Sequence, residues 1–331
     1  MVKITKRNHY NPCLWTAYWN PDYFKAKLSN LKDCGDARNQ PIYRLNIISD
    51  SIHPTIPDKV FFEKNQCFTP ITPESAKKFC KKYHPSQYEN FCQNMSTETY
   101  YLDFEDILTG MENIAYGPLL ETIRIGGVSS IEHRTFLTYF LIIQAMRSHE
   151  MMTAMINRTI STGMDKFEYF WLLKNAWGDE KILARAMAPV AFSPWIFYRT
   201  KEDTFPMCDS PIMIGRNSIM AILSPKLLLE INVGTKVSTG EPILFNEISK
   251  DKFREFQLRV LKNTYKDIIF HNRSALENFQ RLPEYHHRLE IINDPIQREK
   301  LTDLAANRVL SAINGFNKSS PEFDLIISQY N

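Results

Sequence analysis

The feature that most constrains this chain is a long apolar stretch near its middle. Phe136 to Met146 reads FLTYFLIIQAM, and its surroundings predict one helix from about Ser130 to Arg158, with Ser130 as the N-cap. The stretch has about half of the roughly 20 apolar residues that a membrane span needs. Because apolar residues occupy most sides of this helix, we expect a buried central element of a globular protein rather than a membrane anchor.

The segments around this helix predict a mixed architecture. DFEDILTGMENIAYGPLLETIRIG predicts two short helices broken near Gly117–Pro118, and further helices are expected over Lys166–Trp177 and Asp179–Met187. After Pro189, short apolar runs such as SIMAILSP and KLLLEINV are typical of an antiparallel sheet with tight turns. A helix over KDKFREFQLRVLKNTY, a strand over DIIFHN and a closing helix around Pro295–Ala312 complete the C-terminal part.

The N-terminal part predicts strands followed by a basic helix. IYRLNII and KVFFE read as two strands joined by the polar loop SDSIHPTIPD. TPESAKKFCKKY begins with Thr72 as a helix cap and Pro73 at the first helical position. Its four lysines form a face of the kind that is usually solvated, although the interleaved Phe79 and Tyr83 would suit contact with a phosphate backbone.

Together these patterns predict an α+β fold: a helical middle with a long central core helix, packed with a mostly antiparallel sheet from the N-terminal and C-terminal parts. We expect residues 1–331 to form a single intertwined unit, with a helical region at 104–188 inside it and a frayed tail over 317–331.

Composition and common motifs exclude several classes of protein. The net charge of +3 is too small to indicate nucleic-acid binding by itself. The six cysteines lack CxxC spacing, and the chain's start lacks the apolar stretch of a secretory signal, so we expect reduced thiols, a cytoplasmic location and no membrane partner. The motifs GxGxxG, GxxxxGK[ST], GxSxG and HExxH are absent, which disfavours dinucleotide enzymes, P-loop NTPases, α/β-hydrolases and zincins.

Polar residues in unexpected places supply the first candidate site residues. His9 and Tyr10 precede Pro12, which disfavours a helix at Asn11, so they lie in an extended or turn segment. A histidine there could act as an acid, a base or an anion binder near neutral pH. The alternative is that His9 and Tyr10 only anchor the N-terminal segment against the core.

The predicted central helix carries the second group. Gln144 and Arg147 stand three residues apart, so they share one face of an otherwise apolar helix. A buried guanidinium needs a carboxylate or an anionic ligand, and an internal salt bridge and a bound ligand are equally compatible with this pattern. His149 and Glu150 fall on other faces, and we expect them at the surface.

The third group is Asp209 in FPMCDSP, at the end of a predicted strand. An Asp before Ser and Pro can bond backbone amides in a turn, and it also places a carboxylate at a sheet edge, where sites are often built. Either role, a structural turn or part of a site, fits this segment.

Taken in order, these three segments resemble an uncharacterised family, domain of unknown function family 4238, over roughly residues 7 to 275. HYNPCLWTAYW is similar to the family's N-terminal HYxPxxxLxxF, with altered downstream positions; LIIQAMR matches its Gln-x-x-Arg, and FPMCDSP its F-x-x-S/C-D-x-P element. ILSPKLLLEI and Glu112 with the downstream PLLE also fit the family pattern. The family has no settled activity, so the resemblance implies candidate residues and no reaction.

Two functions follow as hypotheses. In the first, the protein is an enzyme acting on a phosphate-containing substrate, a hydrolase of the nuclease or phosphoesterase type, as a toxin or defence effector would be. His9 would be the general acid or base, Arg147 would hold the phosphate, and Asp209 would orient His9 or hold a divalent metal ion. Tyr10 and Gln144 would bind the substrate, which could be a nucleic acid.

In the second hypothesis the protein is a non-catalytic module that binds a small ligand or another protein. The same residues then form a hydrogen-bond and salt-bridge network, with Arg147 paired to Asp209 or Glu112.

Overall fold

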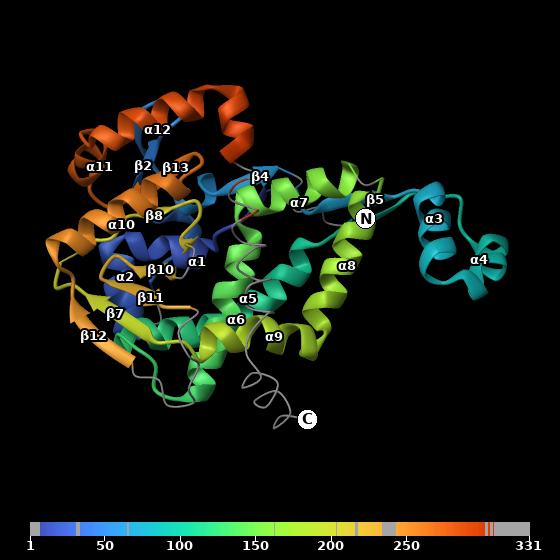
Figure 1. The fold of residues 1–331 in the computed structure, drawn as a ribbon, viewed down its shortest axis with the longest axis horizontal. Coiled ribbons are helices and arrows are strands. Elements are labelled where there is room, and N and C mark those ends of the chain that lie inside the picture. Colours follow the sequence, from blue (N-terminus) through green and yellow to red (C-terminus); the bar gives the residue numbers. More distant parts are fainter. Residues whose placement is uncertain are drawn as a thin grey trace.

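The computed structural model describes residues 7–30, 34–64, 66–161, 163–202, 204–215, 218–233, 243–301, 304 and 307. Within these residues the fold is of the predicted α+β class, with a helical middle and mostly antiparallel sheets built from the N-terminal and C-terminal parts (Figure 1). The predicted tail over 317–331 lies outside the described residues. Residues 295–301 are helical, and most of the rest of the expected closing helix is also outside them.

The larger sheet comes from the C-terminal half, as the short apolar runs predict. Its five strands lie in the order β12-β7-β11-β10-β9, and all neighbours are antiparallel except β12 and β7, which are parallel. Every residue of the central β10 and β11 is buried, which explains why their sequences are apolar at all positions except Ser224 and Glu230. The strands are β7 (Trp195–Arg199), β9 (Ile212–Ile214), β10 (Ile219–Ser224), β11 (Leu227–Ile231) and β12 (Ile243–Glu247).

A second sheet joins the two ends of the chain, with its strands in the order β3-β2-β13-β8. They are β2 (Ile42–Asn46), β3 (Ser51–Thr55), β8 (Met207–Cys208) and β13 (Asp267–Phe270). The expected loop SDSIHPTIPD was wrong in part, because it contains β3. This strand lies at the edge of the sheet. Pro54 lacks a backbone N–H, and this is tolerated there because none of the described strands pairs with the outer side of β3.

Two small antiparallel ribbons complete the strands: β1 (Arg7–His9) with β4 (Phe62–Lys64), and β5 (Phe68–Ile71) with β6 (Tyr100–Asp103). The predicted strand KVFFE therefore contributes β4, but it pairs with the N-terminal segment and not with IYRLNII. This pairing fixes the position of His9 and Tyr10.

The helical middle differs from the prediction at its first helix. Its helices are α5 (Glu105–Ile125), α6 (Ile131–Arg147), α7 (His149–Ser161), α8 (Lys166–Gly178) and α9 (Glu180–Ala191). The expected break near Gly117–Pro118 was wrong, since α5 runs through Pro118. A proline inside a helix costs about 3 kcal/mol. The buried Leu119 and Ile123 beyond it hold the second half of the helix against the core.

The prediction of a single helix over Ser130–Arg158 was also wrong, because α6 ends before Ser148 and α7 begins after it. That residue has an extended backbone (φ −52°, ψ 146°), and its hydroxyl accepts a hydrogen bond from the amide of Met151. Ser148 thus starts α7 as a cap would. The preceding helix, α6, is the buried central element that the apolar run predicts, with Leu137, Leu141 and Ile143 almost fully covered.

The remaining helices flank these layers. They are α1 (Cys13–Thr16), α2 (Pro21–Leu28), α3 (Pro73–Tyr83), α4 (Tyr88–Asn94), α10 (Lys250–Asn263), α11 (Arg273–Gln280) and α12 (Pro283–Asn293). Figure 1 shows α3 and α4 projecting from the body beside α7 and α8, on the side opposite the larger sheet. The Thr72 side chain accepts from the amide of Ser75, so the predicted cap of α3 is confirmed.

The aromatic N-terminal segment is part of the core. Trp15 and Trp19 are fully buried, and their indole N–H groups donate to the carbonyls of Leu223 and Phe205 at 2.9 and 2.7 Å. These bonds attach the segment that follows His9 to β10 and to the residues just before β8.

Candidate functional site

His9 is the last residue of β1, and its side chain is 15% exposed. Its Nδ1 is 3.2 Å from the carbonyl oxygen of Val60 and 3.7 Å from Cys13 Sγ, and its Nε2 is 3.9 Å from Asp58 Oδ1. Burial, opposed by Asp58, lowers the pKa of His9 from 6.5 to about 4, and it raises the pKa of the Cys13 thiol to about 12. At neutral pH the imidazole is therefore uncharged and the thiol is protonated.

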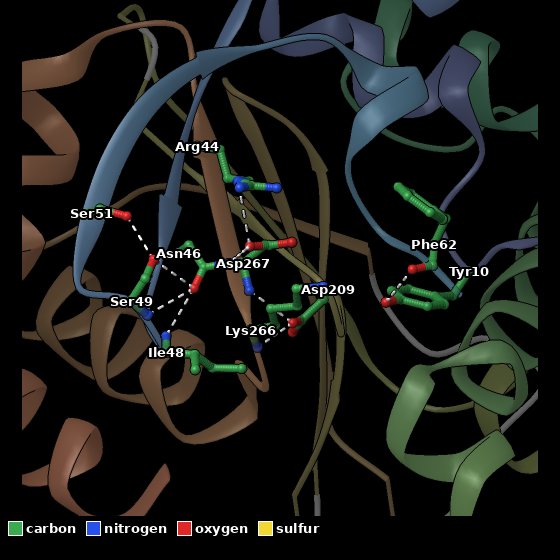
Figure 2. Close-up of polar contacts among 10 residues, drawn as sticks. All are labelled: Tyr10, Arg44, Asn46, Ile48, Ser49, Ser51, Phe62, Asp209, Lys266 and Asp267. Carbon is green, nitrogen blue, oxygen red and sulfur yellow. Dashed lines mark hydrogen bonds and ion pairs between the residues drawn. The ribbon is translucent and has the colours of Figure 1, made fainter. Parts of the chain in front are cut away.

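The two residues after His9 attach this segment to other strands. The Tyr10 hydroxyl donates to the carbonyl of Phe62 at 3.3 Å (Figure 2). The Asn11 side-chain amide donates to the carbonyls of Cys208 and Asp209 at 3.2 and 3.4 Å. Tyr10 and Asn11 are both buried, so this segment runs through the protein interior and does not line an open site.

Arg147 ends α6 and is 3% exposed. Its Nη2 donates to Glu105 Oε1 at 3.1 Å and to the backbone carbonyl of His9. Arg147 thus pairs with Glu105, a carboxylate that the second hypothesis did not name; Asp209 accepts from backbone amides, and the side chain of Glu112 is not among those that the structure describes. Gln144 is also buried, at 1% exposure, one helical turn before Arg147.

Asp209 is fixed by the backbone at the start of β13. Its Oδ1 accepts from the backbone amide of Tyr265 at 3.0 Å. Its Oδ2 accepts from the backbone amides of Lys266 and Asp267 at 2.6 and 3.0 Å (Figure 2). The carboxylate does bond backbone amides, as a structural role requires. These amides lie more than fifty residues further along the chain and not in a local turn.

A second buried carboxyl, which the sequence did not suggest as a site residue, lies beside Asp209. Asp267 Oδ1 accepts from the Asn46 side-chain amide at 3.1 Å and is 3.7 Å from Arg44 Nε (Figure 2). Burial raises the pKa of Asp267 to about 6, while Arg44 acts in the opposite direction. Its only sequence signal is an acidic residue at the start of the apolar run DIIF.

His149 was expected at the surface, and that was wrong. It is 8% exposed, and its ring lies 4.3 Å from the Tyr265 ring and 5.6 Å from the Tyr10 ring. Its Nδ1 is 3.6 Å from Glu63 Oε1, and burial followed by the charge of Lys266 lowers its pKa to about 4. The prediction failed because the break at Ser148 changes the helical register on which it relied. The side chain of Glu150 is not among those that the structure describes.

The three signature segments thus meet, but mainly through one stretch of backbone. Arg147 contacts the carbonyl of His9, Asn11 contacts the carbonyl of Asp209, and His149 packs on Tyr10. The imidazole of His9, the guanidinium of Arg147 and the carboxylate of Asp209 each face different protein groups. The arrangement can hold these segments together. At neutral pH the His9 ring is uncharged, and the side chains of Arg147 and Asp209 already have protein partners.

The basic helix α3 uses its aromatic residues for packing. Phe79 and Tyr83 lie 4.8 and 5.1 Å from the Trp171 ring on α8. Lys82 Nζ and the Tyr83 hydroxyl both reach Glu168 Oε1, at 2.5 and 2.6 Å. The interleaved aromatic residues therefore dock α3 on α8, while the lysines stay exposed.

Among the described residues, no group of three or more His, Cys, Asp or Glu side chains could hold a metal ion. All six cysteines are described and none forms a disulfide. No helix in the described ranges is both long and apolar enough to cross a membrane.

Comparison with known proteins found no relative: no family model matches the chain, and no curated protein or solved structure is similar to it. The resemblance to family 4238 therefore stays a prediction.

Proposed function

We propose that this chain is a non-catalytic binding protein, in which His9, Tyr10, Gln144, Arg147 and Asp209 form the scaffold that holds distant segments together. The observation that carries the proposal is the pairing of Arg147. Its buried guanidinium already contacts Glu105 and the His9 carbonyl, so an incoming phosphate would have to compete with a charged protein partner.

The remaining contacts support the same proposal. A histidine with a pKa of about 4 is protonated in roughly one molecule in a thousand at pH 7, so His9 is a poor general acid there. Its Nδ1 faces the Val60 carbonyl, and both oxygens of Asp209 accept from backbone amides. A phosphate-directed hydrolase built on these residues would need each of them to change partner.

The test compares unfolding free energies of purified variants. Arg147→Ala leaves Glu105, whose side chain is only 12% exposed, without this charge partner, and we expect a loss of about 3–5 kcal/mol. Arg273→Ala is the matched control, since its bond to Glu277 is exposed, and it should cost less than about 1 kcal/mol. Double-mutant analysis with Glu105→Gln should recover part of the loss.

The competing hypothesis is tested in the same preparations with phosphodiester and phosphomonoester substrates, including single-stranded RNA and DNA. The proposal is overturned if the wild type hydrolyses any of them while His9→Ala abolishes turnover at unchanged stability. Nucleic acid and other phosphate-bearing ligands stay alternative partners until that measurement. The absence of disulfides among the six cysteines is compatible with the cytoplasm, a location that stays a prediction.

A further inference from the structure

A cleft of about 570 Å³ opens at one end of the larger sheet. That volume lies within the range of small-molecule sites, about 300–1,000 Å³. Its walls come from two segments, the end of β7 with the loop after it and the end of β12 with the residue after it. The lining residues are Arg199, Thr200, Lys201, Glu202, Thr204, Phe245, Asn246, Glu247 and Ile248.

The position of the cleft follows from the strand directions. β7 and β12 are parallel, with Arg199 opposite Glu247, so both strands end at the same edge of the sheet. Carboxyl ends of parallel strands commonly build ligand crevices because the chain leaves each strand there as a loop. The helix α10 begins directly beyond, with Ser249 as its N-cap.

One wall of the cleft is rigidly built. The Arg199 guanidinium donates to the carbonyls of Ile125 and Gly126, at the end of α5, and lies 4.2 Å over the Phe245 ring. A Cβ on Gly126 would come within 2.6 Å of Arg199 Nε, and one on Gly127 within 2.7 Å of Phe245. These glycines therefore permit the close approach that places Arg199 and Phe245.

The segment that follows β7 in the same wall is also held by hydrogen bonds at its described residues. The amides of Thr200 and Thr204 donate to the carbonyls of Lys226 and Pro225, and both threonine hydroxyls donate to the carbonyl of Glu202. The backbone that carries Lys201 and Glu202 is thus fixed before any ligand arrives, which lowers the ordering cost of binding.

The charges in the cleft are of both signs. Lys201, Glu202 and Glu247 form no ion pair with any residue in the described part of the chain, and Arg199 contacts carbonyls rather than carboxylates. A simple anion would meet two carboxylates here, and a simple cation would meet a lysine and an arginine. A ligand that carries both charges can complement all four groups at once.

We infer that this cleft binds a small zwitterion with a carboxylate, a separate ammonium group and an apolar part, of the short-peptide type. The carboxylate lies toward Lys201 and Arg199, the ammonium toward Glu202 and Glu247, and the apolar part against Phe245 and Ile248. This inference rests on the proposed function, because it gives the binding protein its ligand class.

Calorimetric titration of the full wild-type chain tests the inference with the dipeptide Gly-Phe, its N-acetyl derivative and its C-terminal amide. We expect Gly-Phe to bind, and each derivative, which lacks one of the two charges, to bind at least tenfold more weakly. Absence of Gly-Phe binding at millimolar concentration would overturn the inference. Equally tight binding of the N-acetyl derivative or of inorganic phosphate would also overturn it, in favour of an anion site.

Two variants locate the charges. The Lys201→Gln variant should bind Gly-Phe no more tightly than it binds the C-terminal amide. The Glu247→Gln variant should bind Gly-Phe no more tightly than it binds the N-acetyl derivative. Lys262→Gln, on α10 and outside the cleft lining, is the control and should bind as the wild type does. These titrations use folded wild type and surface variants, so their failure is separate from a failure of the Arg147 unfolding test.

Discussion

Two histidines that are largely covered by protein, His9 and His149, predict a specific loss of stability in acid. Burial is the main cause that lowers the pKa of His9 and of His149 from 6.5 to about 4. In the unfolded chain each histidine takes up a proton near pH 6.5, so the unfolded state binds more protons than the folded state below that pH. The free energy of unfolding should therefore fall from pH 6.5 to about 4, by about 3 kcal/mol for each histidine.

Asp267 acts in the opposite direction over nearly the same range. Its pKa is raised from 3.8 to about 6 by burial, so the folded state keeps a proton that the unfolded chain has already released. The stability this proton contributes is complete below pH 3.8 and is lost as the pH rises through 6, a change of about 3 kcal/mol. The three groups together leave a net loss of about 3 kcal/mol on acidification.

The assay is urea unfolding followed by tryptophan fluorescence at several pH values between 7 and 4.5. Other carboxyl groups also titrate in the wild type, so the comparison between variants carries the argument. His149→Phe, which keeps an aromatic ring between Tyr10 and Tyr265, should remove about half of the histidine contribution and flatten the profile. Asp267→Asn should make the profile steeper. A His149→Phe protein with the wild-type pH slope would refute the reasoning.

Three further perturbations have outcomes that the contacts specify. Gly126→Ala places a Cβ at a backbone φ of +67° and against Arg199, so we expect a loss of at least about 1 kcal/mol by urea unfolding and weaker Gly-Phe binding. Trp15→Phe leaves the Leu223 carbonyl buried without its donor, and a cost of about 1–3 kcal/mol should appear as a lower urea midpoint. Glu168→Ala removes the acceptor of two hydrogen bonds from α3, so limited proteolysis should cut α3 and α4 faster than in the wild type, and an unchanged rate would contradict that role.

Local signals in the sequence were enough for the fold class and for several elements. Thr72 followed by Pro73 predicts where α3 begins, because a cap and a pre-set φ act within one turn. Period-two and continuous apolar runs predict β10 and β11, because burial on both faces shows directly in composition. The pairing of β2 with β13 has no local signal, since it depends on contacts between residues more than 200 positions apart.

The same distinction explains the candidate site. Arg147 and Asp209 stand out in the sequence because a charge on an apolar element needs a partner, and both have partners. The identity of those partners depends on tertiary structure, so Glu105 and the amides at the start of β13 were not foreseen. His149 was missed because one residue, Ser148, ends α6 and begins a helix with a different register.

The contacts also suggest why charged groups hold this interior together. An apolar contact tolerates sliding, whereas the carboxylate of Asp209 accepts from three successive amides and so admits one register of β13 against β8. Arg147 likewise fixes the His9 carbonyl to the end of α6. Buried charges often add little net stability, and their value in some proteins lies in selecting one arrangement. Such selection is what the proposed binding protein needs if the second sheet, assembled from both ends of the chain, is to keep one strand register in every molecule.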